Sequence, residues 1–300
     1  MKKLLIICGP TATGKTKMAF ALAKRLNGEL ISADSRHVYR ELTILTGKDL
    51  PVDGTKIWAT DVTSITESYS VSQYRIHARA CIDAITSRSK LPILVGGTGL
   101  YIRSVIAAID TASVPRSSDL RKELEAQSVS QLQRTLQALD QTKWEKMNAS
   151  DRMNPRRLVR AIEVATWHAK HGLSQDQTPQ FDVLWIGLRA SPEELRKNIT
   201  RRVRGRFDQG VVDEVKRLGN ILSDIALPAA TSLGFSIVRS VIDGEIDEDQ
   251  AVEQWTAQEY RYAKRQMTWF NKEKNIHWFD IAGKNHQTEI EALVRAWYTS

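Results

Sequence analysis

The chain has little cysteine and no long apolar run, and both absences narrow what it can be. Only two of its 300 residues are cysteine, Cys8 and Cys81, and they form no CxxC pair. This excludes a disulfide framework and a zinc knuckle and suits a reducing compartment, so we expect a cytoplasmic protein. No stretch reaches the ~18 apolar residues of a membrane span, so we expect no membrane partner.

A metal-ligand pattern and a hydrolytic motif are also missing. The six histidines show no metal-ligand spacing. An ATPase that hydrolyses its nucleotide needs an apolar strand ending in Asp and a catalytic Glu after it. The stretch "IWATD" ending at Asp61 is short and mixed, and "LPILVGG" ends in glycine. This argues against a hydrolysing ATPase and weighs less against a small-molecule kinase.

The charge balance is positive. Lysine and arginine number 43 against 35 acidic residues, a formal net charge of +8. Such a balance favours a polyanionic partner, nucleic acid first, without showing one.

What the chain does contain is "GPTATGKT" at 9–16, directly after the apolar "LLIIC". Gly-x4-Gly-Lys-Thr is the spacing of a phosphate-binding loop, in which glycines turn backbone N–H groups inward and the following helix adds its dipole. Lys15 would contact the outer phosphate and Thr16 can hold Mg²⁺. The motif is strong for phosphate and weak for which phosphate compound. The predicted loop residues are Gly9, Pro10, Thr11, Ala12, Thr13, Gly14, Lys15 and Thr16.

Alternating short apolar runs and helical patterns predict an α/β fold, a P-loop NTPase-like parallel sheet flanked by helices. Strands are expected at 3–8, 28–33, 91–97 and 182–190, and helices at 15–26 and 70–89. Strand signals vanish over 113–181, where helical patterns occupy 119–140 and 155–170 before a polar linker at 174–180. We therefore expect a core of 1–112 and 182–300 with a mainly helical insertion domain at 113–181.

Asp34 follows the second predicted strand, whose carboxyl end lies beside the phosphate loop. It could contact a metal through water, act as a general base, or merely cap the next turn. A second glycine turn, "VGGTGLYIR" at 95–103, ends another strand and would place Thr98 and Arg103 near the same rim.

Seven motifs together resemble the tRNA dimethylallyltransferase family, in the family's order and from residue 4 to about 280. They are "GPTATGKT", "LISADSRHVYR", "YSVSQYR", "LPILVGGTGLYIR", "NPRRLVRAIEV", "GVVDEV" and "YAKRQMTWF". The resemblance implies that the loop holds the diphosphate of dimethylallyl diphosphate rather than ATP. It implies transfer of the dimethylallyl group to the exocyclic amine of the adenosine 3′-adjacent to the anticodon, releasing diphosphate. The implied partners are the tRNA anticodon stem-loop and Mg²⁺, and we expect a monomer.

Site residues follow from the same resemblance, position by position. Asp34 is the implied general base for the adenine amine, and Thr98 a hydrogen-bonding neighbour of that amine. Lys15 and Arg202 are the implied diphosphate contacts, and Thr16 is the implied metal contact. The implied tRNA contacts are Asp34, Ser35, Arg36, His37, Thr98, Arg121, Arg156, Arg157, Leu158, Val159 and Arg160.

The chain departs from the family pattern at three places. Arg36 and His37 stand where the family usually has Met-Gln, and Glu259-Tyr260 where it has Thr-Arg. The third is "ASDRMN" at 149–154, where the family has "IHPND". The first puts a base contact at His37 in doubt. We expect activity with altered RNA contacts.

Two helical faces can each be interpreted in two ways, either as a functional surface or as an ordinary structural one. At 100° per residue, Arg156, Arg157 and Arg160 share a face opposite Leu158, typical either of phosphate contacts or of a solvated helix surface. Trp255, Tyr262 and Trp269 form a stripe in a later helix, which favours core packing over base stacking.

Two rival functions remain at this point. The first is a P-loop kinase of a small metabolite, which predicts an arginine-rich lid and no need of basic helices. The second is an RNA-binding protein with nucleotide as a structural ligand, for which Asp34 would be dispensable.

Overall fold

The structure is a computed structural model that describes residues 1–50, 55–107, 114–172, 181–218 and 231–300. The chain divides into two compact units, Met1–Ile106 with Pro179–Ser300, and Ala107–Thr178. The linker expected at 174–180 lies outside the described residues. The units are described one at a time.

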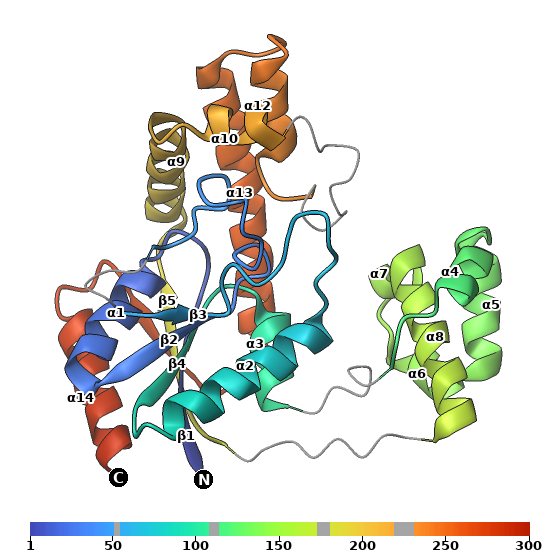
Figure 1. Cartoon of the computed structure of the whole chain (residues 1–300), viewed down its shortest axis with the longest axis horizontal. Helices are drawn as coiled ribbons and strands as arrows, with labels where there is room; N and C mark the ends of the chain where they lie inside the picture. Colours follow the sequence, from blue (N-terminus) through green and yellow to red (C-terminus); the bar gives the residue numbers. More distant parts are fainter. Residues whose placement is uncertain (51–54, 108–113, 173–180, 219–230) are drawn as a thin grey trace. The chain divides into compact units, whose positions relative to one another are not determined.

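The first unit is built on a six-stranded parallel sheet of order β3-β2-β4-β1-β5-β6 (Figure 1). Its strands are β1 Lys2–Cys8, β2 Gly28–Ser32, β3 Ile57–Trp58, β4 Leu91–Val95, β5 Phe181–Arg189 and β6 Ile276–Asp280. Because all are parallel, their carboxyl ends meet at one edge, where open α/β sheets bind ligands. The expected α/β class is confirmed.

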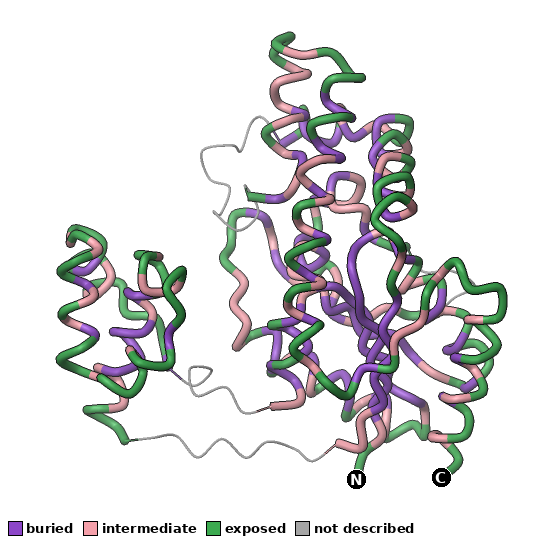
Figure 2. The backbone as a smooth tube through the Cα atoms, turned by 180° about the vertical axis from the view of Figure 1, so that it is seen from behind, coloured by how far each residue is buried: buried purple, intermediate pink, exposed green. Residues whose placement is uncertain are grey.

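The central strands are buried on both faces, as their unbroken apolar runs require. In register, Leu5 lies opposite Ile93, and Cys8 lies opposite Gly187. Figure 2 shows these strands as the buried centre of the unit.

Two helical layers cover the sheet. Leu5 and Ile7 face one core with α1 (Lys15–Leu26) and α14 (His286–Thr299). Leu4 and Ile6 face the other core. The helices of that layer are α2 (Val71–Thr86) and α3 (Gly99–Ile106). Alternate side chains of β1 therefore serve opposite cores.

Further helices of the same unit follow β5. They are α9 Pro192–Asp208, α10 Val211–Arg217, α12 Phe235–Ile242 and α13 Glu248–Phe270. The long α13 packs on α9 and on α3, so it spans from these helices to the sheet (Figure 1). Trp255 on α13 is fully buried and packs edge-on against Phe207, as the core interpretation of the aromatic stripe predicts. The other two members of the stripe, Tyr262 and Trp269, are only partly buried.

The second unit is helical and has its own small core. Its helices are α4 Ser118–Glu125, α5 Val129–Leu139, α6 Gln141–Lys146, α7 Ala149–Arg152 and α8 Pro155–His171. The pattern at 119–140 divides into two helices, because Ser128 forms a capping box with Gln131 and starts α5 there. Asn154 caps α8, and Pro155 is its first residue.

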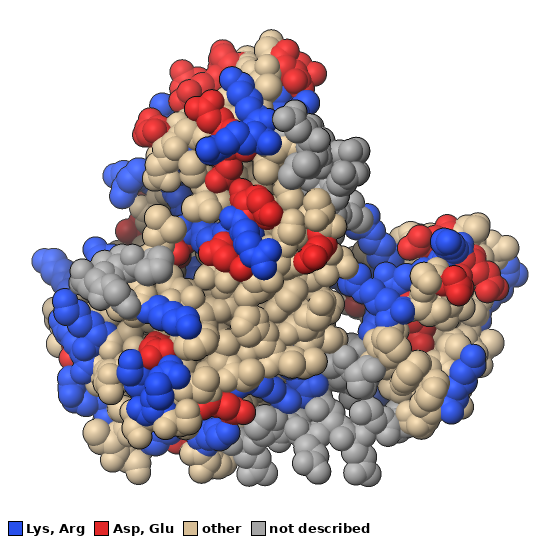
Figure 3. Space-filling model, in the orientation of Figure 1, with Lys and Arg blue, Asp and Glu red and all other residues tan. Residues whose placement is uncertain are grey.

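Surface charges of both signs are interspersed on the face shown in Figure 3, so the positive excess does not form one broad field there. Within the described ranges, no helix has the length and apolar character needed to cross a membrane.

Candidate active site

The phosphate loop joins β1 to α1 and lines a cavity of about 900 Å³. Gly9 and Gly14 have φ values of 128° and 78°, which favour glycine. A Cβ on Gly9 would lie 2.2 Å from the Leu188 carbonyl oxygen of β5, so no side chain fits. The loop therefore needs both the conformation and the small size that its glycines supply.

Gln266 of α13 fixes the loop to the second glycine turn. Its Oε1 accepts a hydrogen bond from Thr11 N at 2.9 Å, and its Nε2 donates to Gly97 O at 3.0 Å. A Cβ on Gly97 would lie 2.0 Å from that Nε2. Gln266 lies within the "YAKRQMTWF" motif, but no local pattern there indicates its contacts with the loop.

Lys15 and Arg202 lie at one cavity, as the resemblance implied. Lys15 Nζ donates to Pro10 O at 2.6 Å, and Arg202 donates to Thr11 Oγ1 at 2.5 Å and to Gly47 O at 2.8 Å. Burial and the nearby Arg202 lower the pKa of Lys15 to about 8, against the opposing effect of neighbouring carboxylates. The site thus holds two cations whose hydrogen bonds go to neutral oxygens.

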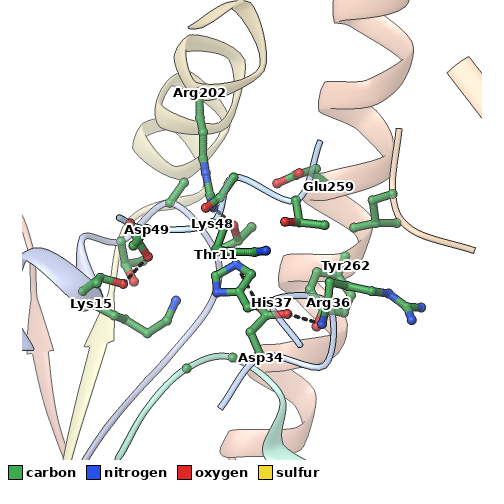
Figure 4. Close-up of a pocket in the computed structure, with 18 of the residues that line it drawn as sticks. Thr11, Lys15, Asp34, Arg36, His37, Lys48, Asp49, Arg202, Glu259 and Tyr262 are labelled. Atoms are coloured by element: carbon green, nitrogen blue, oxygen red, sulfur yellow. Dashed lines mark hydrogen bonds and ion pairs between the residues drawn. The ribbon is translucent and has the colours of Figure 1, made fainter. Parts of the chain in front are cut away.

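Asp34 lies on the same cavity with one oxygen in a local turn (Figure 4). Its Oδ1 accepts from Arg36 N at 2.9 Å, and its Oδ2 lies 4.0 Å from His37 Nε2. Burial raises the pKa of Asp34, but His37, the Arg36 amide and Arg202 outweigh it, and the pKa falls below its ordinary value. Asp34 is therefore ionised at neutral pH, and its turn contact does not occupy both oxygens.

Thr98 lies beside this carboxylate through Ser35, whose backbone N–H donates to Thr98 Oγ1 at 3.1 Å. Thr98 also hydrogen-bonds Tyr262, whose pKa burial raises to about 12. Arg103 is exposed on α3 and does not line the cavity described here, contrary to the expectation from its turn.

Three residues that break the family pattern also line the cavity: Arg36, His37 and Glu259. His37 is buried, and burial lowers its pKa despite Asp34, so it is mainly neutral at pH 7. Glu259 forms a buried ion pair with Arg206 at 2.5 Å. Burial raises the pKa of Glu259, but Arg206 and Arg202 bring it below its ordinary value. Glu259 thus neutralises one of the three arginines of α9 that line the cavity, Arg201, Arg202 and Arg206.

The oxygens around Thr16 fit Mg²⁺. Thr16 Oγ1 donates to Asp49 Oδ2 at 2.6 Å beside the loop, and hydroxyl and carboxylate oxygens are hard ligands. Within the described residues, no group of three or more His, Cys, Asp or Glu could hold a metal on its own. Asp61, from the weak "IWATD" stretch, instead pairs with Lys48.

The predicted tRNA contacts of the helical unit fall into two sets. Arg121 and Arg160 both pair with Glu163, at 2.7 and 3.1 Å, and the Glu163 side chain is only 1% exposed. Leu158 and Val159 are buried in the core of the unit, so their side chains do not face solvent. These four residues therefore help to hold the unit together.

Arg156 and Arg157 form the exposed set on α8, and Arg157 pairs with Asp151. The three-arginine face expected from the helical spacing is thus only partly free, because Arg160 turns to Glu163 and to Val114 O. Arg156 is the arginine of this helix that the described ion pairs leave most open to a partner.

A family model described as IPP transferase matches residues 37–273. The chain belongs to the IPP transferase family. It is 38% identical to a tRNA dimethylallyltransferase of Anoxybacillus flavithermus over 93% of this chain and 91% of the relative. It is 37% identical to one of Acetivibrio thermocellus over 93% and 92%. The resemblance carried by the seven motifs is confirmed, and the family is one of transferases.

Solved structures give the same result. A tRNA isopentenylpyrophosphate transferase from Bacillus halodurans superposes with a TM-score of 0.73 at 33% identity, covering 99% of this chain and 97% of that one. A eukaryotic dimethylallyltransferase acting on tRNA gives a TM-score of 0.80 at 25% identity, covering 99% and 78%. The P-loop NTPase-like fold is thereby confirmed.

Proposed function

We propose that this chain transfers a dimethylallyl group from dimethylallyl diphosphate to the exocyclic amine of the adenosine 3′-adjacent to the anticodon in tRNA, releasing diphosphate. The observation that carries the proposal is one cavity holding a phosphate loop with two cations and, beside it, the ionised Asp34. Membership in a family of tRNA prenyltransferases supports the same reaction.

The loop is suited to a diphosphate leaving group. Breaking the allylic C–O bond gathers negative charge on the departing oxygens and positive charge on the carbon. Lys15, Arg202 and the phosphate loop line the same cavity, so they are placed to stabilise the developing anion there. Bound Mg²⁺ would add a further positive charge there, and Thr16 is the loop residue that would hold it.

Asp34 is suited to the nucleophile. An adenine amine is a weak nucleophile, and a carboxylate against it both orients it and removes its proton as the new C–N bond forms. The adenine must leave its stack to reach the cavity, which costs a few kcal/mol. Thr98 lies next to Asp34 through Ser35 and can steady the same amine.

The anticodon stem-loop is the proposed RNA partner. The exposed Arg156 and Arg157 of α8 are the side chains that we assign to its phosphates. Residues 34–37 are the strip that we assign to the extruded base. We also propose a monomer that acts in the cytoplasm, since the cysteine usage fits a reducing compartment.

The kinase alternative loses ground to the family membership, and one assay separates the two. Purified protein is incubated with tRNA and dimethylallyl diphosphate labelled in the prenyl group, beside a second reaction with γ-labelled ATP and no prenyl donor. We expect label from the prenyl donor alone in the RNA. Label from ATP in a small hydroxylated acceptor, with none in RNA from the prenyl donor, would contradict the proposal.

A further inference from the structure

Asp49 is an exposed carboxylate beside the phosphate loop that the reaction described so far does not use. In Figure 4 it lies next to Lys15, whereas Asp34 lies below His37. Asp34 and Asp49 are thus placed for different roles, and the third carboxylate that lines the cavity, Glu259, is paired with Arg206.

The segment that carries Asp49 is held firmly over the loop. The buried carboxylate of Glu214, in the "GVVDEV" motif of α10, accepts from the backbone N–H groups of residues 43–45 at 2.7–3.1 Å. Arg202 bonds Gly47 O, and the buried Lys48 bonds Tyr39 O at 2.6 Å. Asp49 follows Lys48 directly, so its position is set by these contacts, which lie on both sides of Gly47 in the sequence.

Glycine at 47 is part of this arrangement. Its φ is +59°, and a Cβ there would lie 2.5 Å from Arg202 Nη2 and 2.8 Å from Arg206 Nη2. A side chain would push both arginines away. The close approach ties the segment bearing Asp49 to the cations of the cavity.

We propose that Asp49 and Thr16 together hold the Mg²⁺ that accompanies the diphosphate, with Asp49 supplying the carboxylate that the missing strand-end Asp supplies in hydrolysing ATPases. The inference rests on the proposed function, because diphosphate oxygens and water complete the coordination. It assigns the metal to Asp49 and leaves Asp34 to the adenine amine.

The geometry suits this cation. Two neighbouring ligands of an octahedral Mg²⁺ with bonds of about 2.0–2.1 Å lie about 2.9 Å apart. Thr16 Oγ1 and Asp49 Oδ2 are 2.6 Å apart, so these two oxygens need to move apart only slightly to become neighbouring ligands of one ion. Mg²⁺ commonly binds through one or two protein ligands plus substrate phosphates, which agrees with the lack of a three-residue cluster among the described residues.

The test measures metal-dependent binding rather than turnover. Calorimetry on the full chain gives the affinity for inorganic diphosphate alone and for diphosphate with saturating Mn²⁺, which stands in for Mg²⁺. The variants are Asp49→Asn and Thr16→Val, which keep side-chain size. The control is Asp249→Asn, because Asp249 is an exposed carboxylate of α13 that does not line the cavity.

We expect Asp49→Asn and Thr16→Val each to reduce the metal-dependent gain in affinity about tenfold or more. Metal-free diphosphate should bind Asp49→Asn within threefold of wild type or more tightly, which also shows that the loop is folded. The control should keep the full gain. A gain within threefold of wild type in Asp49→Asn, or an equal loss with and without metal, would overturn the assignment.

Prenyl transfer by the wild-type protein is assayed separately, so that the two failures are distinguishable. Wild-type protein that transfers prenyl label to tRNA while Asp49→Asn keeps the whole metal gain overturns the Asp49 assignment alone. Wild-type protein that transfers none overturns the proposed function, while the binding comparison still decides where the metal sits.

Discussion

Two pairs of cations, one pair in each unit of this chain, differ in the groups that they bond. In the α/β unit, Lys15 and Arg202 bond neutral oxygens of the phosphate loop and of the segment above it. In the helical unit, Arg121 and Arg160 surround the buried carboxylate of Glu163. A cation that bonds neutral oxygens keeps most of its attraction for an incoming anion. The charge of a cation paired with a carboxylate is largely neutralised by that carboxylate. Basic residues that look alike in the sequence therefore have different roles in the fold: some can bind a ligand, and others stabilise their unit.

The largest expected effect comes from removing Lys15, one of the two cations that bond neutral oxygens and can bind a ligand. We expect Lys15→Ala to lower single-turnover prenyl transfer by about 10³-fold or more, because the leaving diphosphate loses a preorganised charge in the cavity. The tRNA dissociation constant should stay within a few-fold. A hundredfold weaker tRNA affinity would contradict the division between loop and helical unit.

The matching change on the structural side is Glu163→Gln. It leaves two arginines beside a neutral group, and the part-exposed guanidinium groups recover some hydration, so we expect a loss of about 2–3 kcal/mol in the stability of the helical unit. Urea unfolding followed by fluorescence measures it, with exposed Glu145→Gln of the same unit as the control. Unchanged stability would return Arg121 and Arg160 to the set available for RNA.

The pH dependence of diphosphate binding tests whether Lys15 supplies a positive charge to the ligand. Because the pKa of Lys15 is lowered to about 8, the free site loses this charge as pH rises past 8 and binds anions less well. Between pH 7 and 9 we expect the affinity for diphosphate to fall about tenfold relative to Lys15→Arg, which stays charged and reports the titration of the probe itself. An equal change in both proteins would show that Lys15 keeps its proton throughout.

The smallest expected effect separates the arginines of α8. Arg156→Ala should lower the salt slope of tRNA binding by about one, because it removes one phosphate contact without touching the core. The double change with Arg160→Ala should lower the slope no further, because Arg160 bonds Glu163 and Val114 O, but it should destabilise the helical unit. A slope unchanged by Arg156→Ala would make that arginine part of an ordinary solvated face.

The sequence predicts the features that depend on contiguous residues. The loop is one uninterrupted motif, and parallel strands bring Asp34 to it because their carboxyl ends share an edge. The apolar runs of β1, β4 and β5 identify the sheet because these strands are buried on both faces.

The rest depends on contacts between distant segments that leave no local pattern. Gln266 holds a loop 255 residues away, and Glu214 captures the amides of 43–45. Nothing near Asp49 in the sequence indicates that its segment lies over Thr16. For Arg160 a signal was present: Glu163 follows at i+3, a spacing at which opposite charges pair on a helix.

The central claim is that the loop holds a leaving diphosphate while Asp34 takes the proton of the adenine amine. The most direct test is single-turnover prenyl transfer by Asp34→Asn at saturating tRNA and donor, beside the affinity for the donor. This change keeps size and a hydrogen-bond acceptor but removes the negative charge, so we predict a rate lower by ~10²–10⁴. Donor affinity should be kept or increased, because Lys15, Thr16 and the loop amides remain. A rate within threefold of wild type would contradict the account, as would a normal saturated rate with a collapsed donor affinity.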